Sequence, residues 1–275
     1  MIEAGILFAI ILLLIIAGLY VWRMAAGYPH RKSHIAARSI VLCAVIIPFV
    51  LFLTYEFMNA RTFQLFGRIV SEVNTPQPVV ALTFDDGPNP PYTDKLLTVL
   101  RKKEVKATFF VMGAQLEKFS SLGKEMVREG HELGNHSYSH PRMIFKSPRF
   151  IRSEIEKTDQ LIRQAGYAGE IHFRSPYGKK LLLLPFYLSK MNKKNIFWDI
   201  EPDSHTDSAE SADKIVENIL AKTKPGSIML LHAEKQTRKE SLKAVPGIID
   251  GLKQKGYDFV TVSELLAVEG ADKVN

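Results

Sequence analysis

Cysteine is almost absent from this sequence of 275 residues, because Cys43 is the only one. A disulfide within the chain is therefore excluded, and so is chemistry that needs two thiols. The sequence also lacks a glycine-rich phosphate loop, a basic-aromatic cluster and any low-complexity tract. The formal net charge of +7 thus gives no reason to expect a nucleic-acid partner, and it suggests an anionic envelope polymer at most. No feature of the sequence predicts a protein partner.

Charge is nearly missing from two apolar stretches near the N-terminus, residues 4–22 and 39–58. Each approaches the roughly 20 residues that a helix needs to cross a bilayer, so we predict two transmembrane helices that form a membrane anchor over residues 1–58. The alternative for either stretch is a buried core helix. No Lys or Arg precedes the first stretch and no small-residue cleavage site is evident, which argues against a cleaved signal peptide.

Positive charge between the two stretches predicts their orientation. Residues 23–38 hold three arginines and one lysine, and short loops rich in Lys and Arg stay in the cytoplasm. The rest of the chain, beginning with a juxtamembrane segment at 59–77, is then expected on the extracytoplasmic side. The sequence thus predicts a multi-pass protein of the cell membrane.

One domain is expected over residues 78–268, followed by a short tail at 269–275. Within it, apolar runs of strand length alternate with segments whose apolar residues recur at helical spacing. The predicted strands are 79–84, 107–112, 171–174, 195–198, 227–231 and 259–262. The predicted helices are 93–103, 116–128, 148–164 with Ser147 as its N-cap, 182–192, 209–223 and 242–255. This alternation indicates an α/β fold, either an open doubly wound sheet or a closed barrel, with ligands at the carboxyl ends of the strands.

The first predicted strand ends in Asp85 and Asp86, which are followed by Gly87 and Pro88. Such a run is most often only a turn, because Asp and Gly suit turn geometry and Pro cannot continue a strand. Two adjacent carboxylates at the mouth of a parallel sheet also repel each other, unless a cation bound by one of them keeps both ionised. The motif therefore indicates a metal site that needs further ligands.

His136 and His140 can supply these ligands. Two imidazoles spaced four residues apart can present two nitrogens to one ion, and Pro141 makes a loop a better expectation than a helix. Two solvated histidines are the alternative for an isolated pair. With an Asp from the preceding motif, two His ligands leave coordination positions open for water and substrate, as catalytic metal sites require.

Two further motifs follow predicted strands. Arg174 opens the run Arg-Ser-Pro-Tyr-Gly; an Arg there can pair with a carboxylate, and the turn can aim a backbone N–H into the site. A surface Arg before a turn is the alternative. His232 follows the strand 227–231, where a lone His is most often a satisfied buried residue. Its place at the same end of the sheet favours a functional role.

Together, the runs Thr-Phe-Asp-Asp-Gly-Pro, His-Ser-Tyr-Ser-His, Arg-Ser-Pro-Tyr and Leu-Leu-His resemble the motifs of the polysaccharide deacetylase family (NodB homology, carbohydrate esterase family 4) in order and spacing. The resemblance covers residues 63–268, including the stretches Lys-Ala-Thr-Phe-Phe and Gly-His-Glu-Leu-Gly-Asn-His. It implies an irregular (β/α) barrel with fewer than eight regular repeats. It also implies hydrolysis of N-acetyl groups from the amino sugars of a polymer.

The resemblance further implies a role for each matching residue. Asp86, His136 and His140 would be the ligands of one divalent metal ion, with Zn first and Co, Mn or Ni equally suited by ligand type. Asp85 would be the general base that takes a proton from water, and His232 the general acid that protonates the departing amine.

Three more residues receive roles in the same way. Arg174 would position the base Asp85. The turn at Pro176 and Tyr177 would bring the backbone N–H of Tyr177 to the oxyanion.

One segment departs from the family pattern. Where an Asp-Trp pair is common, this chain reads Trp-Asp-Ile-Glu-Pro-Asp-Ser-His after the strand 195–198. Asp203 is our candidate for the carboxylate that tunes the general acid, with Asp199 and Glu201 as possible substitutes. Ser204 stands in place of the Trp, so we expect one wall of the acetyl pocket or substrate groove to be built differently. The adjacent histidine, residue 205, is either a site residue or a solvated loop residue.

The leading interpretation is an amidohydrolase that acts on an N-acetylated envelope glycan. Peptidoglycan is the first choice of substrate, with chitin-like oligomers and exopolysaccharide as others. An O-acetyl esterase acting on xylan or another polymer is a close alternative, because the same attack cleaves esters more readily than amides. A non-catalytic, membrane-anchored glycan-binding protein is a third, but such a descendant would be free to lose the base or a ligand, and this sequence keeps them all.

Overall fold

The computed structural model describes residue 23 and residues 31–204 and 211–271. The chain divides into two compact units, Met1–Ala60 and Arg61–Asn275. In the first unit the described helix is α2 (Arg31–Asn59), which contains Pro48. Over the described residues, none of the helices combines the length and the apolar character needed to cross a membrane.

The predicted multi-pass membrane location is therefore wrong, and the two predicted transmembrane helices lack support. Residues 4–22 lie outside the described residues. Residues 39–58 fall within α2. The predicted cytoplasmic position of residues 23–38 depended on these spans and is withdrawn with them.

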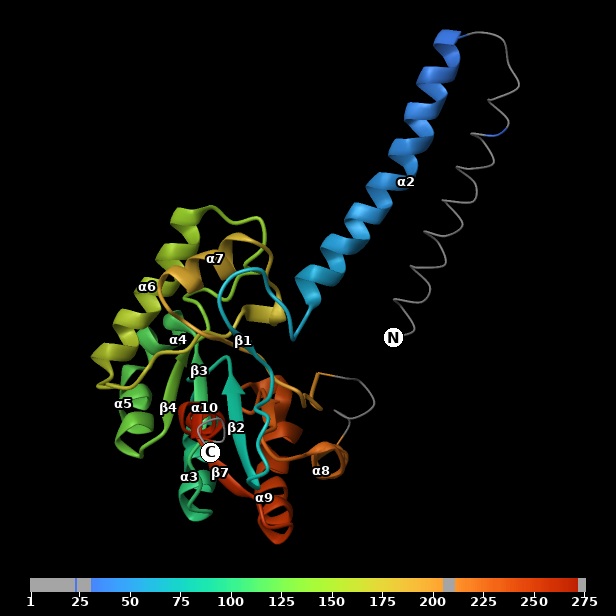
Figure 1. Cartoon of the computed structure of the whole chain (residues 1–275). Helices are drawn as coiled ribbons and strands as arrows, with labels where there is room; N and C mark the ends of the chain where they lie inside the picture. The colour runs from blue at the N-terminus through green and yellow to red at the C-terminus, as the bar shows by residue number, and fades with distance from the viewer. Residues whose placement is uncertain (1–22, 24–30, 205–210, 272–275) are drawn as a thin grey trace. The chain divides into compact units, whose positions relative to one another are not determined.

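The second unit is built on a parallel sheet in which β2 (Val79–Asp85) is central. β3 (Thr108–Val111) pairs with one edge of β2 and β4 (Glu132–Asn135) pairs with β3. β6 (Ile228–Leu231) pairs with the other edge of β2. β7 (Asp258–Val260) pairs with the first residues of β2, Val79–Ala81, on the same edge as β3. Figure 1 shows β2, β3 and β4 side by side at the centre of this unit.

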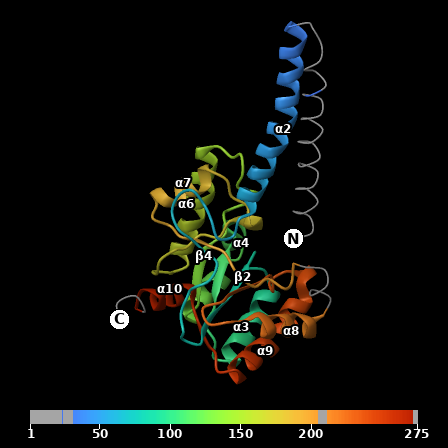
Figure 2. The ribbon, with the colours of Figure 1, turned by 45° about the vertical axis from the view of Figure 1, so that its right-hand side comes forward.

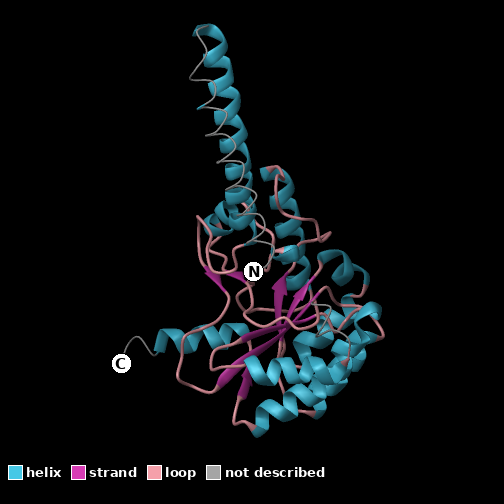
Figure 3. Ribbon diagram, turned by 90° about the vertical axis from the view of Figure 1, so that its right-hand side faces the viewer, coloured by secondary structure: helices cyan, strands magenta, loops and turns pink. Residues whose placement is uncertain are grey.

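The strand path continues beyond β4 through single bridges. Phe173 bridges both Asn135 of β4 and Asn195 of β5 (Asn195–Ile196), and β5 pairs with β1 (Ile69–Val70). Ile200 then bridges Met229 of β6, so the path returns to the strand beside β2. The predicted α/β class is confirmed, and the ring is irregular because isolated bridges close it. Figure 3 shows the strands of this unit among its helices and loops.

Helices cover the sheet in two groups (Figures 1 and 2). In one group, α9 (Lys239–Gln254) packs on α8 (Ala212–Lys222) and on α3 (Tyr92–Lys102). The other group has α4 (Gly113–Lys118), α5 (Ser120–Arg128), α6 (Pro148–Gln164) and α7 (Leu183–Lys190), with α6 contacting α4, α7 and β4. α10 (Val262–Ala271) contacts β2. Two short 3-10 turns, η1 (Pro176–Gly178) and η2 (Gln236–Arg238), complete the described elements.

Side chains along β2 point alternately to its two faces, and this alternation decides which of them reach the inside of the ring. Val80, Leu82 and Phe84 are fully buried in the core that includes the leucines of α3. Successive side chains of a strand point to opposite faces, so Thr83 and Asp85 face the interior. Burial of both faces explains why this strand is an almost continuous apolar run that ends in polar residues.

The predicted helix 148–164 is confirmed as α6. Ser147 accepts a hydrogen bond from Phe150 N–H, and Pro148 occupies the first helical position. The predicted helix 116–128 is instead two helices, α4 and α5, because the chain bends at Phe119, which has φ −123° and ψ 47°.

His131, which precedes β4, makes the stability of this unit sensitive to acid. Its ring is 3% exposed, and its Nδ1 accepts a hydrogen bond from Ala107 N–H at 3.2 Å. Burial and then the charge of Lys106 lower the pKa of His131 to about 4, from an unfolded value near 6.5. The unfolded chain thus binds this proton more readily, so stability is lost as the pH falls from about 6.5 toward 4.

We expect His131→Gln to lessen this pH dependence. Between pH 7 and pH 5 the wild-type free energy of unfolding should lose about 2 kcal/mol more than that of the variant. Urea unfolding at both pH values measures the difference. An equal loss in both proteins would show that folding does not lower the pKa of His131.

Candidate metal centre and active site

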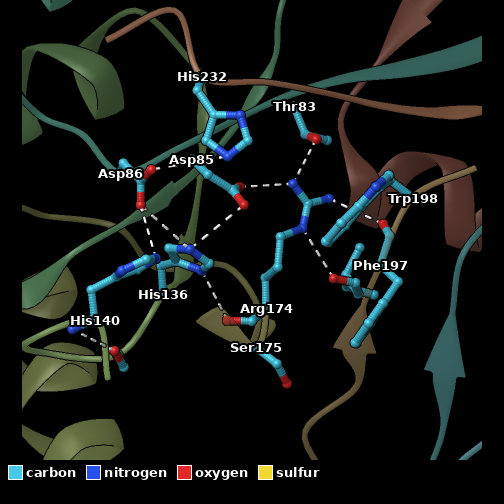
Figure 4. Close-up of polar contacts among 12 residues, drawn as sticks. Thr83, Asp85, Asp86, His136, His140, Arg174, Ser175, Phe197, Trp198 and His232 are labelled. Atoms are coloured by element: carbon cyan, nitrogen blue, oxygen red, sulfur yellow. Dashed lines mark hydrogen bonds and ion pairs between the residues drawn. The ribbon is translucent and has the colours of Figure 1, made fainter. Parts of the chain in front are cut away.

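The polar motifs of the sequence meet at the carboxyl ends of the strands. Asp85 ends β2 and Asp86 follows it, His136 follows β4, and His232 follows β6. Arg174 comes directly after Phe173, the residue that bridges β4 and β5. Figure 4 shows their side chains converging on one place.

Asp86, His136 and His140 form a cluster with the geometry of a metal site. One ligand atom from each lies within 4.8 Å of the other two. Asp86 Oδ1 is 3.1 Å from His140 Nε2 and 3.6 Å from His136 Nε2. These atoms are close enough to bind one ion, but Asp86 Oδ1 forms no hydrogen bond with either histidine.

Two observations test whether these residues fit a divalent cation. Asp86 Oδ1 is buried and accepts no hydrogen bond in the described part of the chain, which leaves a carboxylate oxygen without a partner. His136 Nδ1 lies 2.9 Å from the carbonyl oxygen of Arg174. With a proton on Nδ1, the lone pair of Nε2 points into the cluster, as a metal-binding histidine requires. The residues present therefore fit the ion.

Charges in the cluster favour the ligand forms. Burial opposes ionisation of Asp86, but the nearby histidines and Lys235 outweigh it and lower its pKa to about 2. Burial, and then the charge of His136, lowers the pKa of His140 to about 4. At neutral pH the cluster thus holds a carboxylate and a neutral imidazole. Lys235 Nζ forms an ion pair with Asp86 Oδ2.

Arg174 is wholly buried and uses its guanidinium to hold Asp85. Its Nη1 donates to Asp85 Oδ1 at 2.8 Å and to Thr83 Oγ1 at 2.7 Å. Its Nε and Nη2 donate to the carbonyl oxygens of Ile196 and Phe197 at 3.0 and 3.1 Å. These bonds fix one oxygen of Asp85, and its other oxygen lies 3.6 Å from His136 Nε2, beside the cluster.

His232 approaches the cluster from β6 and is held from behind by Asp203. His232 Nδ1 is 3.1 Å from Asp203 Oδ1, and His232 N–H donates to Asp203 Oδ2 at 2.6 Å. Burial opposes protonation of His232, but the hydrogen bond and charge of Asp203 raise its pKa. Its Nε2 is 3.9 Å from Asp86 Oδ2, so the free ring nitrogen faces the cluster.

The turn at Pro176 and Tyr177 borders the cluster on the side of His140. Tyr177 has φ 58°, and its ring lies 4.5 Å from that of His140. Gly178 N–H and Lys179 N–H close the turn by donating to the carbonyl oxygens of Ser175 and Pro176. In residues 31–204 and 211–271 the N–H of Tyr177 donates to no protein acceptor.

Sequence comparisons now give the family. A family model described as polysaccharide deacetylase matches residues 72–195. The chain is 39% identical over 188 residues to a peptidoglycan-N-acetylglucosamine deacetylase of Bacillus cereus, with 68% of this chain and 67% of that protein covered. This chain belongs to the polysaccharide deacetylase family.

A second relative and a solved structure support the same family assignment for this deacetylase. A peptidoglycan-N-acetylmuramic acid deacetylase of Bacillus subtilis is 35% identical, with 72% of this chain and 40% of that protein covered. A crystal structure of a peptidoglycan N-acetylglucosamine deacetylase superposes with a TM-score of 0.67 at 35% identity, covering 71% of this chain and 91% of that chain. Members of the family generally use a divalent metal, and the cluster of Asp86, His136 and His140 offers a place for one.

In the segment that departs from the family pattern, which follows residue 198, the three carboxylates have different partners. Asp203 alone contacts His232. Asp199 accepts from Ser227 Oγ at 2.7 Å and from Ile228 N–H at 2.8 Å, so it fastens β6. Glu201 accepts from the indole N–H of Trp198 at 2.8 Å. Residue 205 lies outside the described residues.

Glu154 of α6 holds the loop that carries His136 and His140, and no motif of the sequence pointed to it. It is 6% exposed and accepts from the N–H groups of Tyr138 and Ser139 at 3.0 and 2.8 Å, and from Ser139 Oγ at 2.8 Å. Pro141 predicted a loop here and not a helix, and the structure agrees. Both Ser137 and His140 have positive φ. A carboxylate in the buried stripe of an amphipathic helix is the signal that could have identified it.

We expect Glu154→Ala to weaken metal binding without touching a ligand. The variant leaves two backbone N–H groups without their acceptor, and loss of such an outer partner typically costs about 10–100-fold in metal affinity. Titration of the metal-free protein with Zn²⁺ measures this. Glu156→Ala is the matched control, because Glu156 lies on the same helix with its side chain 52% exposed. Equal affinities for both variants would contradict the role of Glu154.

Proposed function

We propose that this deacetylase hydrolyses N-acetyl groups on the amino sugars of a cell-envelope polysaccharide, with peptidoglycan as the preferred substrate. Chitin-like oligomers and exopolysaccharide are the other substrates considered. One observation carries the proposal: a carboxylate, Asp85, and an imidazole, His232, face the same three-ligand cluster from two different strands. Hydrolysis of an amide needs both a base for water and an acid for the leaving nitrogen.

Each residue has a distinct task in this proposal. A divalent cation held by Asp86, His136 and His140 would supply Lewis-acid chemistry, polarising the acetyl carbonyl and acidifying water, and Zn is our first choice over Co, Mn or Ni. Asp85 takes the proton of the attacking water, and Arg174 fixes its orientation. The N–H of Tyr177 donates to the oxygen that gains negative charge.

His232 completes the reaction by protonating the amine as the carbon–nitrogen bond breaks. Asp203 raises its pKa and so keeps a proton available. The hydrogen bond between Asp203 and His232 Nδ1 also fixes the ring, with Nε2 toward the leaving group.

Acetate release from defined oligosaccharides tests this function. We expect the purified full chain, loaded with Zn²⁺, to release acetate from N-acetylglucosamine oligomers and from peptidoglycan fragments, and to stop after chelation and dialysis. Re-addition of the metal should restore the rate. Acetate from O-acetyl xylan alone would assign an esterase instead, and no acetate from any of these with a full metal site would refute the proposal.

A further inference from the structure

Arg61, the first residue of the second compact unit, is bonded to the segment that follows β5. Its Nη2 donates to Glu201 Oε2 at 3.1 Å, and its guanidinium carbon lies 4.9 Å from the centroid of the Trp198 ring. The same oxygen of Glu201 accepts from the indole N–H of Trp198 at 2.8 Å. One carboxylate oxygen thus links the cation to the ring that the cation covers. We call these three residues the Arg61 clamp.

Trp198 connects the Arg61 clamp to the turn that borders the metal cluster. Its ring is 5% exposed. Gly178, the last residue of that turn, leaves room for the ring, because a Cβ atom at Gly178 would lie 3.2 Å from Trp198 Cη2 and 3.4 Å from Phe197 Cε1. The rings of Phe197 and Trp198 are stacked, with 5.4 Å between their centroids. The edge of the indole ring therefore supports the turn that carries the N–H of Tyr177.

The Arg61 clamp also lies next to Arg174, which holds the base. The guanidinium carbon of Arg174 is 5.5 Å from the centroid of the Trp198 ring, and Figure 4 shows the two side chains beside each other. Burial lowers the pKa of Arg174, whereas the charge of Asp85 and then that of Glu201 act to raise it. The clamp thus reaches the site through one aromatic ring and one charge.

All three residues of the Arg61 clamp lie outside residues 72–195, which the family model matches. The family match therefore assigns no role to Arg61. Its ion pair also does little for the stability of the fold, because the side chain of Arg61 is 42% exposed and such pairs contribute little. A contribution to the geometry of the site is the role that its contacts support.

From this arrangement we infer that Arg61 is a positioning residue for deacetylation, acting through the other two members of the clamp on the turn that presents the Tyr177 N–H. The inference rests on the proposed function and adds a residue to its machinery. Tyr177 has φ 58°, a conformation that persists only where the surroundings hold it. A donor to the oxyanion must also be placed before the reaction begins, so a small displacement of the turn costs rate.

Two variants and their combination test the inference with the full chain. Arg61→Met removes the cation, and Glu201→Gln removes the ion pair but keeps an acceptor for the indole N–H. We expect each to lower kcat for acetate release from an N-acetylglucosamine oligomer about tenfold, a part of the roughly 10²–10³-fold loss that removing an oxyanion donor causes. KM should change less than about twofold, because this bond strengthens only in the transition state. The double variant should lose no more than either single variant, since both break the same clamp.

Fluorescence gives a second measurement that does not depend on activity. Trp22 and Trp198 are the two tryptophans of the sequence, so a Trp22→Phe background leaves Trp198 as the indole that emits. Arg61→Met in this background should shift the emission to longer wavelengths, because the ring loses the side chain that covers it.

Arg101→Met is the matched control. Arg101 pairs with Glu129 at similar side-chain exposures, 55% and 10%, but lies in the last turn of α3. It should keep the wild-type kcat and emission. In every variant we expect about one equivalent of bound Zn²⁺ and a Tm that falls by no more than about 4 °C, which separates positioning from loss of metal or of the fold.

The outcomes separate this inference from the proposed function. A wild-type kcat in Arg61→Met would overturn the inference while leaving the deacetylase assignment intact. Unchanged emission of Trp198, or losses of kcat that multiply in the double variant, would also overturn it, because the three residues would then not act as one clamp. If the wild-type protein with a full metal site released no acetate, the proposed function would fail, and the role of Arg61 in it would fail as well.

Discussion

Asp85→Asn is expected to lower kcat for acetate release by about 10²–10⁴-fold, the range that a positioned general base contributes. The amide has the shape of the carboxylate and keeps an oxygen for the 2.8 Å bond from Arg174, but it cannot take a proton. Stopped assays with Zn²⁺-saturated protein and an N-acetylglucosamine oligomer measure the loss.

Metal content provides the control for this variant. Asp85 is not among the three residues of the cluster that could hold the metal, so the variant should still bind about one equivalent of Zn²⁺. Asp250→Asn is the matched substitution, because Asp250 lies on α9 and its side chain is 49% exposed. Asp85→Asn protein that binds metal and retains the wild-type kcat would rule out Asp85 as the base.

Arg174→Met should be the most destabilising single substitution at the site, at about 3–5 kcal/mol, the usual result of removing one partner of a buried ion pair. It leaves Asp85 as an unpaired buried charge and deprives Thr83 Oγ1 and two carbonyl oxygens of their donor. It also removes the guanidinium that lies 3.9 Å from the ring centroid of Phe110. Urea unfolding measures the loss.

A double-mutant cycle separates charge from packing. When Asp85→Asn accompanies Arg174→Met, no charge stays unpaired, so the double variant should recover part of the stability that the single variant loses. Arg128→Met, at an exposed position, should change stability by no more than about 0.5 kcal/mol. Additive losses in the cycle would mean that Arg174 acts through packing alone.

The strand ends could be read from the sequence because a buried parallel strand leaves a strong pattern. Val79–Asp85 is apolar until it reaches the site, and the change to Asp85 and Asp86 marks the edge where ligands bind. The same reasoning placed Arg174 and His232 at that edge, and the structure brings them together there with His136. The predicted helix 148–164 was confirmed because Ser147, Pro148 and a following glycine are local signals.

Other parts of the fold depend on contacts that no local pattern encodes. β4 reads Glu-Leu-Gly-Asn, a poor strand by composition. Gly134 is needed there because a side chain would meet the ring of Phe110 at 2.5 Å. The predicted strand 171–174 is reduced to a bridge at Phe173, which pairs with single residues on either side. Glu154 was missed because its partners are backbone groups of another segment.

The membrane prediction failed for a different reason. Hydropathy describes composition and cannot determine where a helix begins and ends. α2 joins an apolar stretch to the charged residues at 31–38, and among the described residues no helix combines the length and the apolar character that a membrane span needs.

The backbone of the site has a conformational cost that the rest of the sheet does not share. Asp86, Ser137, His140 and Tyr177 all have φ between 56° and 76°, a region that costs a residue with a Cβ atom about 1–2 kcal/mol. Side chains such as Glu154 and Arg174 hold these segments in place. A bound ligand would oppose the same relaxation, so filling the site should stiffen the loops around it as well as enable the reaction. The loops whose backbone geometry suits the chemistry are thus also the part of the fold that a bound ligand would stabilise most.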